Sequence, residues 1–243
     1  MIRLVDVRKS FGGKEVIHGI DLTVNDGETL AVIGGSGSGK STLLRLMIGL
    51  IPPTSGEIWI GDKNIAGLAE EELDEIRLHM GMVFQYSALF DSMTVGDNVA
   101  FGLREHTSLS EEEIKKVVAE KLELVGLPGA ESMMPTSLSG GMKKRVSLAR
   151  AIAFGPEIIF YDEPSSGLDP IMTAKIDELI TSTQKALKVT SVVVTHDMHS
   201  ACRIADRIAM VAAGELVACE PVEEFLKLKD ERVREFLAAA HMV

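Results

Sequence analysis

The stretch "GGSGSGKS", residues 34–41, lies between the apolar segment "ETLAVI" (28–33) and the apolar run "TLLRLMIGL". The spacing G-x-x-x-x-G-K-[ST] between a predicted strand and a predicted helix is typical of a phosphate-binding loop. Its glycines let backbone N–H groups surround a phosphate, and the helix adds its positive N-terminal end. Lys40 supplies a positive charge for the terminal phosphates, and Ser41 offers a hydroxyl to Mg²⁺. We therefore predict a nucleotide site made by Gly34, Gly35, Ser36, Gly37, Ser38, Gly39, Lys40, Ser41 and Thr42.

A second candidate site element is the acidic pair that follows the apolar strand "IIFY". Asp162 comes directly after these residues, and Glu163 is next. A carboxylate at the C-terminal end of a buried strand is costly unless it serves a site. We expect Asp162 to hold Mg²⁺, mostly through water, and Glu163 to polarise the water that attacks the γ-phosphate. ATP and Mg²⁺ are the predicted ligands.

The rest of the chain is predicted to form one α/β unit with a helical insertion. Short apolar or alternating runs predict strands at 2–8, 16–24, 28–33, 56–60 and 80–85. The opening third is therefore largely antiparallel, and residues 66–150 are mainly helical, with a capping box of Ser110 and Glu113 at one helix start. From residue 157 onward, "EIIFYDEP", "SVVVTHD" and "RIAMVAAGELVA" read as strands alternating with helices, which favours a parallel sheet.

Composition and charge exclude several classes of protein. With 46% hydrophobic and 25% charged residues, the composition is that of an ordinary globular protein. The net charge of −11 argues against a nucleic-acid partner, and we interpret the basic run Lys143, Lys144 and Arg145 as a solvated helix face. Cys202 and Cys219 form neither a metal-site spacing nor a disulfide framework, which fits a reducing compartment. No stretch approaches about 18 charge-free apolar residues, so we predict no membrane span.

Five further segments follow one another in an informative order. They are Phe11, Gln85 after "MVF", "LSGGM" (138–142), "SGLD" (166–169) and His196 after "SVVVT". Together with the phosphate loop and the acidic pair, they resemble the nucleotide-binding subunits of ATP-binding cassette (ABC) transporters over nearly the whole chain. The resemblance implies an α/β fold of the P-loop NTPase type, with a RecA-like core, an N-terminal antiparallel β subdomain and a helical subdomain. It implies a single domain over 1–243, with the helical subdomain at about 86–150.

The resemblance also implies a role for each motif in an ATPase that releases ADP and phosphate. Phe11 would stack on adenine. The catalytic residues would be Glu163, His196 and Gln85, and the metal would be held by Ser41, Gln85 and Asp162.

The signature "LSGGM" explains why a helix would begin with two glycines. In this family the signature of a second copy closes over the nucleotide, so Ser139 and the N–H groups of Gly140 and Gly141 would meet the partner's phosphate. Asp169 of "SGLD" would also belong to the nucleotide site. The resemblance thus implies a homodimer with two composite sites related by a two-fold axis.

Met142 stands where the signature commonly has glutamine, and the side chain's usual amide hydrogen bonds are therefore lost. "LSGGMKKRVSLARA" and "YSALFDSMTVGDNVAF" (86–101) resemble the ATPase subunits of Mla-type lipid transporters. This implies phospholipid transport between the inner and outer membranes through a separate permease, with the chain peripheral on the cytoplasmic face of the inner membrane. It also allows for a periplasmic lipid-binding subunit and a small cytoplasmic regulator.

Alternatives remain at three points. The cargo could be an amino acid or another small solute, or the chain could be a soluble ABC ATPase without a transport role. Leu89, Phe90 and Met93 are predicted to dock a permease helix, or else to pack within the helical subdomain. A final helix at about 222–240 is expected to pack by one face, or alternatively to contact a second copy, through Val222, Leu226, Val233 and Leu237.

Overall fold

The computed structural model describes residues 1–242 and divides the chain into two units. The first, here called the phosphate-loop unit, is Met1–Arg77 together with the residues from Val189 onward. The second, the signature unit, is Leu78–Lys188. Within residues 1–242, no helix is long and apolar enough to cross a bilayer.

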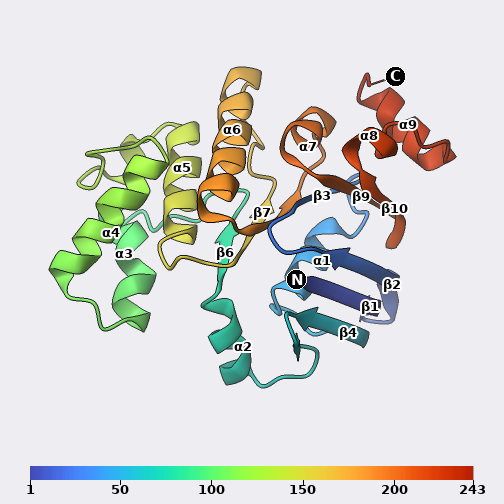
Figure 1. The fold of residues 1–243 in the computed structure, drawn as a ribbon, viewed down its shortest axis with the longest axis horizontal. Coiled ribbons are helices and arrows are strands. Elements are labelled where there is room, and N and C mark those ends of the chain that lie inside the picture. Colours follow the sequence, from blue (N-terminus) through green and yellow to red (C-terminus); the bar gives the residue numbers. More distant parts are fainter. Residues whose placement is uncertain (243) are drawn as a thin grey trace. The chain divides into compact units, whose positions relative to one another are not determined.

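An antiparallel sheet of order β2–β1–β4–β5 begins the phosphate-loop unit (Figure 1). Its strands are β1 (Ile2–Phe11), β2 (Lys14–Val24), β4 (Ser55–Ile60) and β5 (Lys63–Asn64). Ile2 pairs with Val24 on one side and with Ile60 on the other, and it is fully buried, as is Val24. The alternation of apolar residues thus fixes the register by turning one face of β1 inward. The predicted N-terminal antiparallel subdomain is confirmed.

A second set of strands in this unit has the order β10–β9–β3–β8. They are β3 (Thr29–Ile33), β8 (Thr190–Val194), β9 (Arg207–Ala212) and β10 (Glu215–Pro221). β3 pairs in parallel with both β8 and β9, and every residue of β3 and β8 is buried, as the continuous apolar runs predict. We expected one strand over "RIAMVAAGELVA", and the structure instead has an antiparallel hairpin. Ala213 and Gly214 adopt φ of 48° and 80°, and this left-handed pair turns the chain between β9 and β10.

The helices of the phosphate-loop unit are α1 (Lys40–Met47), α2 (Glu70–Arg77), α7 (Met198–Ile204), α8 (Val222–Phe225) and α9 (Glu231–Ala239). The single helix expected at about 222–240 is therefore two helices, because the Asp230 carboxylate accepts a hydrogen bond from Arg232 N (2.9 Å) and caps a new start. Val233 and Leu237 are fully buried in a cluster that includes Ala31 and Ile33 of β3, and Val222 and Leu226 pack against it. The expected packing face is confirmed.

The signature unit combines two parallel strands with helices that contact one another (Figure 1). Its elements are β6 (Met80–Val83), α3 (Val95–His106), α4 (Glu111–Leu124), a 3₁₀ turn (Pro135–Ser137), α5 (Gly140–Ala151), β7 (Ile158–Asp162) and α6 (Pro170–Leu187). Each of α3 to α6 begins at a polar cap: Thr94, Ser110, Ser139 and Asp169. Ser110 and Glu113 form the predicted capping box. The helices α3, α4 and α5 contact one another. They lie within the residues predicted as the helical subdomain, about 86–150, except that α5 ends one residue later, at Ala151.

Candidate active site

The phosphate loop in residues 34–39 contains two glycines whose positive φ disfavours a side chain. Gly34 has φ of 150°, and a Cβ atom there would lie 2.1 Å from the carbonyl oxygen of Val211. Gly39 has φ of 109°, and its Cβ would lie 2.8 Å from Ile17 Cδ1. Gly35 differs, because a Cβ there would meet nothing within 4 Å. The loop is therefore tightly held on its protein side and open at Gly35.

Hydrogen-bond donors gather at this loop. Lys40 is only 8% exposed, and its Nζ donates to the carbonyl oxygens of Gly34 (2.8 Å) and Gly35 (2.9 Å). The N-cap of α1 is Gly39, which has no side chain to cap the first turn of the helix. Among the residues that the structure describes, the buried Ser38 Oγ has no hydrogen-bond partner. A buried ammonium, an uncapped helix start and an unpartnered hydroxyl together fit a bound phosphate. Ser41 is exposed and Thr42 half-buried in the first turn of α1.

The other two predicted site residues of this unit occupy exposed positions. Phe11 ends β1 and is 48% exposed, with Lys9 Nζ 5.0 Å from the ring centroid. His196 follows β8 and is exposed. The adjacent Asp197 carboxylate caps α7 by accepting from the backbone N–H of His199 (2.9 Å) and of Ser200 (3.2 Å). The ring of Phe11 and the imidazole of His196 are thus accessible on the surface of this unit.

In the signature unit, the structure brings two predicted catalytic residues to one place. Glu163 has φ of 48°, a left-handed conformation that is strained for glutamate. Its carbonyl oxygen accepts a hydrogen bond from Ser166 N (3.1 Å), while Gln85 Nε2 donates to Ser166 Oγ (3.2 Å). Asp162, half-buried, is the last residue of β7. Ser166 is a residue of "SGLD" whose bridging position the sequence did not indicate.

Lys144 corrects the interpretation of the basic run. It is not part of a solvated helix face: it is 7% exposed, and its Nζ donates to the Gln85 carbonyl oxygen and lies 3.5 Å from the Glu163 carbonyl oxygen. Burial lowers the pKa of the Lys144 ammonium, and the nearby charges of Glu163 and Asp162 oppose that shift. α5 packs on α3 and β6, so one of its faces is turned inward. The helical spacing of Lys144 from the buried Gly141 and Leu148 was the available signal.

The signature itself begins α5 with little covering it. Ser139 is exposed and caps the helix by accepting from Met142 N (3.3 Å), and Gly140 is exposed as well. A Cβ on Gly141 would come within 2.3 Å of Met172 Cε, the end of a flexible side chain. Asp169 caps α6 through the N–H groups of Ile171 (2.9 Å) and Met172 (3.0 Å). Ser139 is thus a helix cap that also faces solvent, as a group reaching a second copy must.

Comparison with known proteins assigns the family. Residues 17–166 match the ABC transporter family. The intermembrane phospholipid transport system ATP-binding protein MlaF of Haemophilus influenzae is 44% identical over 93% of this chain and 86% of that protein. This chain belongs to the ABC transporter family. The probable ribonucleotide transport ATP-binding protein mkl of Mycobacterium tuberculosis is 43% identical to this ABC protein. The match covers 97% of this chain and 66% of the mkl protein.

Solved ABC cassettes show the same fold. A dimeric, post-hydrolysis structure of the cassette MJ0796 bound to ADP and Pi has a TM-score of 0.83 and 34% identity, covering 91% of this chain and 99% of that one. The ABC protein is therefore an ATP-binding, ATP-hydrolysing subunit of a membrane transporter with the P-loop NTPase fold. The predicted family, fold and ATPase activity are confirmed.

Proposed function

We propose that this ABC ATPase drives phospholipid transport between membranes through a separate integral membrane permease. The observation that carries the proposal is 44% identity to MlaF over 93% of the chain and 86% of that relative. The mkl relative supports a ribonucleotide as the alternative cargo, but the chain covers only 66% of that protein. Under the proposal, the ATPase lies peripherally on the cytoplasmic face of the inner membrane.

The proposed site works as a homodimer, each copy contributing both of its halves. Lys40 and the loop hold the phosphates of ATP, and the exposed ring of Phe11 stacks on adenine. Glu163 polarises the attacking water, Gln85 contacts Mg²⁺ and that water and senses the transport partner, and His196 is the third catalytic residue. The residues proposed to act on the nucleotide of the second copy are Ser139, Gly140, Gly141 and Asp169.

Mg²⁺ is the proposed metal. Ser41, Gln85 and Asp162 offer hydroxyl, amide and carboxylate oxygens, which are the hard ligands that Mg²⁺ prefers, and Mg²⁺ sites commonly add phosphate oxygens to few protein ligands. Bound beside the phosphates, the metal would neutralise charge that develops on them. Ser41 is exposed at the start of α1, so its hydroxyl is accessible to such an ion.

The proposed permease contact is the loop that follows Gln85. Phe90 is 42% exposed, and its ring lies 4.9 Å from that of Phe101, which is 39% exposed. Leu89 and Met93 are half-buried, so Phe90 is the most exposed of the three residues predicted for this contact. Tyr86, at 86% exposure, lies in the same loop. Exposed aromatic side chains of this kind favour a protein contact.

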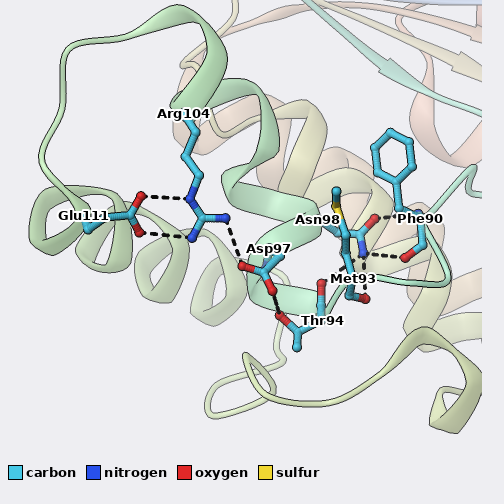
Figure 2. A network of polar contacts seen from close by, with 7 residues as sticks. All are labelled: Phe90, Met93, Thr94, Asp97, Asn98, Arg104 and Glu111. Atoms are coloured by element: carbon cyan, nitrogen blue, oxygen red, sulfur yellow. Dashed lines mark hydrogen bonds and ion pairs between the residues drawn. The ribbon is translucent and has the colours of Figure 1, made fainter.

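This loop is held in place rather than left loose (Figure 2). The buried Asn98 of α3 accepts from Phe90 N (2.8 Å), and the two N–H groups of its Nδ2 are shared among the carbonyl oxygens of Phe90 (3.1 Å), Met93 (3.2 Å) and Thr94 (3.0 Å). One amide therefore fixes the backbone on both sides of Phe90. A preorganised aromatic group loses little conformational entropy when a partner helix binds it.

The cargo is tested by measuring ATPase activity of the complex with its permease in detergent, with and without added phospholipid. We expect stimulation by phospholipid and none by amino acids or by ribonucleotides other than ATP. A complex that responds only to a ribonucleotide, or only to an amino acid with its binding protein, would replace the lipid proposal.

The contact surface is tested with Phe90→Asp. A carboxylate in place of the ring should weaken recovery of the permease in pull-down experiments and leave ATP binding by the isolated subunit unchanged. Leu109→Asp, at a comparably exposed apolar position in the α3–α4 connection, is the matched control and should keep the permease. Equal recovery with Phe90→Asp and with Leu109→Asp would remove Phe90 from the contact.

A further inference from the structure

Lys144 is a buried cation that contacts two backbone carbonyl oxygens. It lies in α5, five residues after Ser139 of the signature, and it is 7% exposed. Its Nζ donates to the carbonyl oxygen of Gln85 and reaches that of Glu163 at 3.5 Å. Burying an ammonium is unfavourable unless its donors are used. The two contacts of Lys144 therefore offset part of the cost of its burial, and they lie beside two residues of the proposed ATPase site.

These contacts close a ring of hydrogen bonds within the signature unit. Lys144 binds the Gln85 backbone, and the Gln85 side chain donates to Ser166 Oγ (3.2 Å). Ser166 N then donates to the Glu163 carbonyl oxygen (3.1 Å), which Lys144 also approaches. The ring joins the signature helix, the segment after β6 and the segment after β7. A displacement of one member changes the hydrogen bonds of the others.

The two backbone segments that Lys144 contacts adopt conformations that need support from their surroundings. Glu163 has φ of 48°, and such a conformation persists only where the surroundings hold it. Directly after Gln85, Ser87 and Ala88 have φ of 62° and 46°. The half-buried Arg150, also of α5, donates to the carbonyl oxygens of Ser87 (3.0 Å) and Ala88 (2.7 Å). Two cations of the signature helix thus hold consecutive parts of the Gln85 segment.

We propose that Lys144 is a positioning residue for ATP hydrolysis, which ties the signature helix to the backbone of Gln85 and of Glu163. It rests on the proposed function, in which these two residues act on the water and on Mg²⁺. Lys144 itself touches neither ATP nor water in this role. Its ammonium keeps the glutamine and the glutamate in register with Ser139, so a shift of α5 is passed to both.

The test is Lys144→Met, which keeps much of the length of the side chain and removes the ammonium. We expect kcat for ATP to fall by about 10- to 100-fold, because a small misplacement of catalytic groups causes losses of this size, while KM changes little. Lys144→Arg, which keeps the charge and the donors, should recover much of kcat. Lys143→Met, one residue earlier on α5 and half-buried, is the matched control and should keep the parental kcat.

Three results would overturn the inference: a parental kcat in Lys144→Met, an equal loss in Lys143→Met, or no recovery with Lys144→Arg. If thermal unfolding shows that Lys144→Met does not fold, Lys144→Gln replaces it under the same criteria, with a polar group in the buried position. Glu163→Gln is measured in parallel. Parental turnover in that variant contradicts the proposed function, whereas an inactive Glu163→Gln beside a fully active Lys144→Met contradicts only the inference on Lys144.

Discussion

The two units hold the residues proposed for ATP hydrolysis in different ways. The phosphate loop depends largely on short-range features, since Gly34 and Gly39 adopt φ of 150° and 109° and Lys40 bonds to carbonyls five and six residues away, although Val211 also approaches Gly34 from a distant part of the chain. The signature unit depends instead on long-range contacts: Lys144 reaches Gln85 across 59 residues, and Arg150 reaches Ser87 across 63. A phosphate-binding loop can be specified by a motif of eight consecutive residues, here 34–41. The placing of Gln85 and Glu163 requires the folded unit.

This contrast predicts the largest effect at Glu163. Glu163→Gln should keep ATP binding, because the phosphate loop is untouched, and should lower turnover by about 10²- to 10⁴-fold through loss of the proposed general base. ATP binding and phosphate release are measured on the same preparation. Turnover at the parental rate would contradict the role given to Glu163.

The need for glycine in the phosphate loop is tested by two variants. Gly34→Ala places a Cβ 2.1 Å from the carbonyl oxygen of Val211, so the loop must shift, and ATP affinity should fall at least tenfold, or about 1.4 kcal/mol. Gly37→Ala meets nothing within 4 Å and has φ of 74°, so only its backbone strain opposes it, and the loss should be smaller. Isothermal titration with ATP compares the two. Equal losses would mean that steric exclusion at Gly34 does not shape the site.

The smallest effect is expected at an ion-pair group on the surface of the signature unit (Figure 2). Arg104 donates to both carboxylate oxygens of Glu111 (2.9 and 3.1 Å) and to Asp97 (2.9 Å), which also accepts from Thr94 Oγ1 (2.6 Å). The hydrogen bond from Thr94 and, to a smaller extent, that from Arg104 lower the pKa of Asp97. The hydrogen bond from Arg104 also lowers the pKa of Glu111. Arg104→Met should lower Tm at pH 7 by only about 2 °C, because these groups are largely solvated.

The pH dependence of that effect has a definite sign. Lowered carboxyl pKa values stabilise the fold above the ordinary values near 4, and this stabilisation is lost as the pH falls through the pKa values of the folded state. The Tm difference between the parent and Arg104→Met should therefore shrink toward about pH 3. A difference that persists or grows in acid would contradict this account of the Arg104 group.

The sequence was most informative where structure is local. The phosphate loop, the capping box of Ser110 and the Ser139 cap follow from short patterns, because each is settled by residues a few positions apart. The family and its ATPase activity followed from motifs in their order along the chain. The individual site residues stay predictions, with proposed roles in the ATPase.

The expectations that failed concern turns and long-range packing. The β9–β10 turn requires a left-handed φ at Ala213, and an alanine in the sequence does not predict that conformation. The break between α8 and α9 depends on a single carboxylate cap at Asp230. Lys144 was assigned to solvent because a run of three basic residues does not show which one faces inward, and the strained φ of Glu163 is set by tertiary contacts.

The central claim, that each site joins the phosphate loop of one copy to the signature of another, is tested most directly with purified heterodimers. Lys40→Ala weakens the loop, and Ser139→Arg places a bulky cation where the partner's phosphate should approach. A heterodimer of Lys40→Ala with Ser139→Arg keeps one intact site if the sites cross between copies, whereas the parental chain paired with the double variant keeps none. We predict ATPase activity in the first heterodimer and almost none in the second. Activity in the second and none in the first would show that each site is built within a single chain.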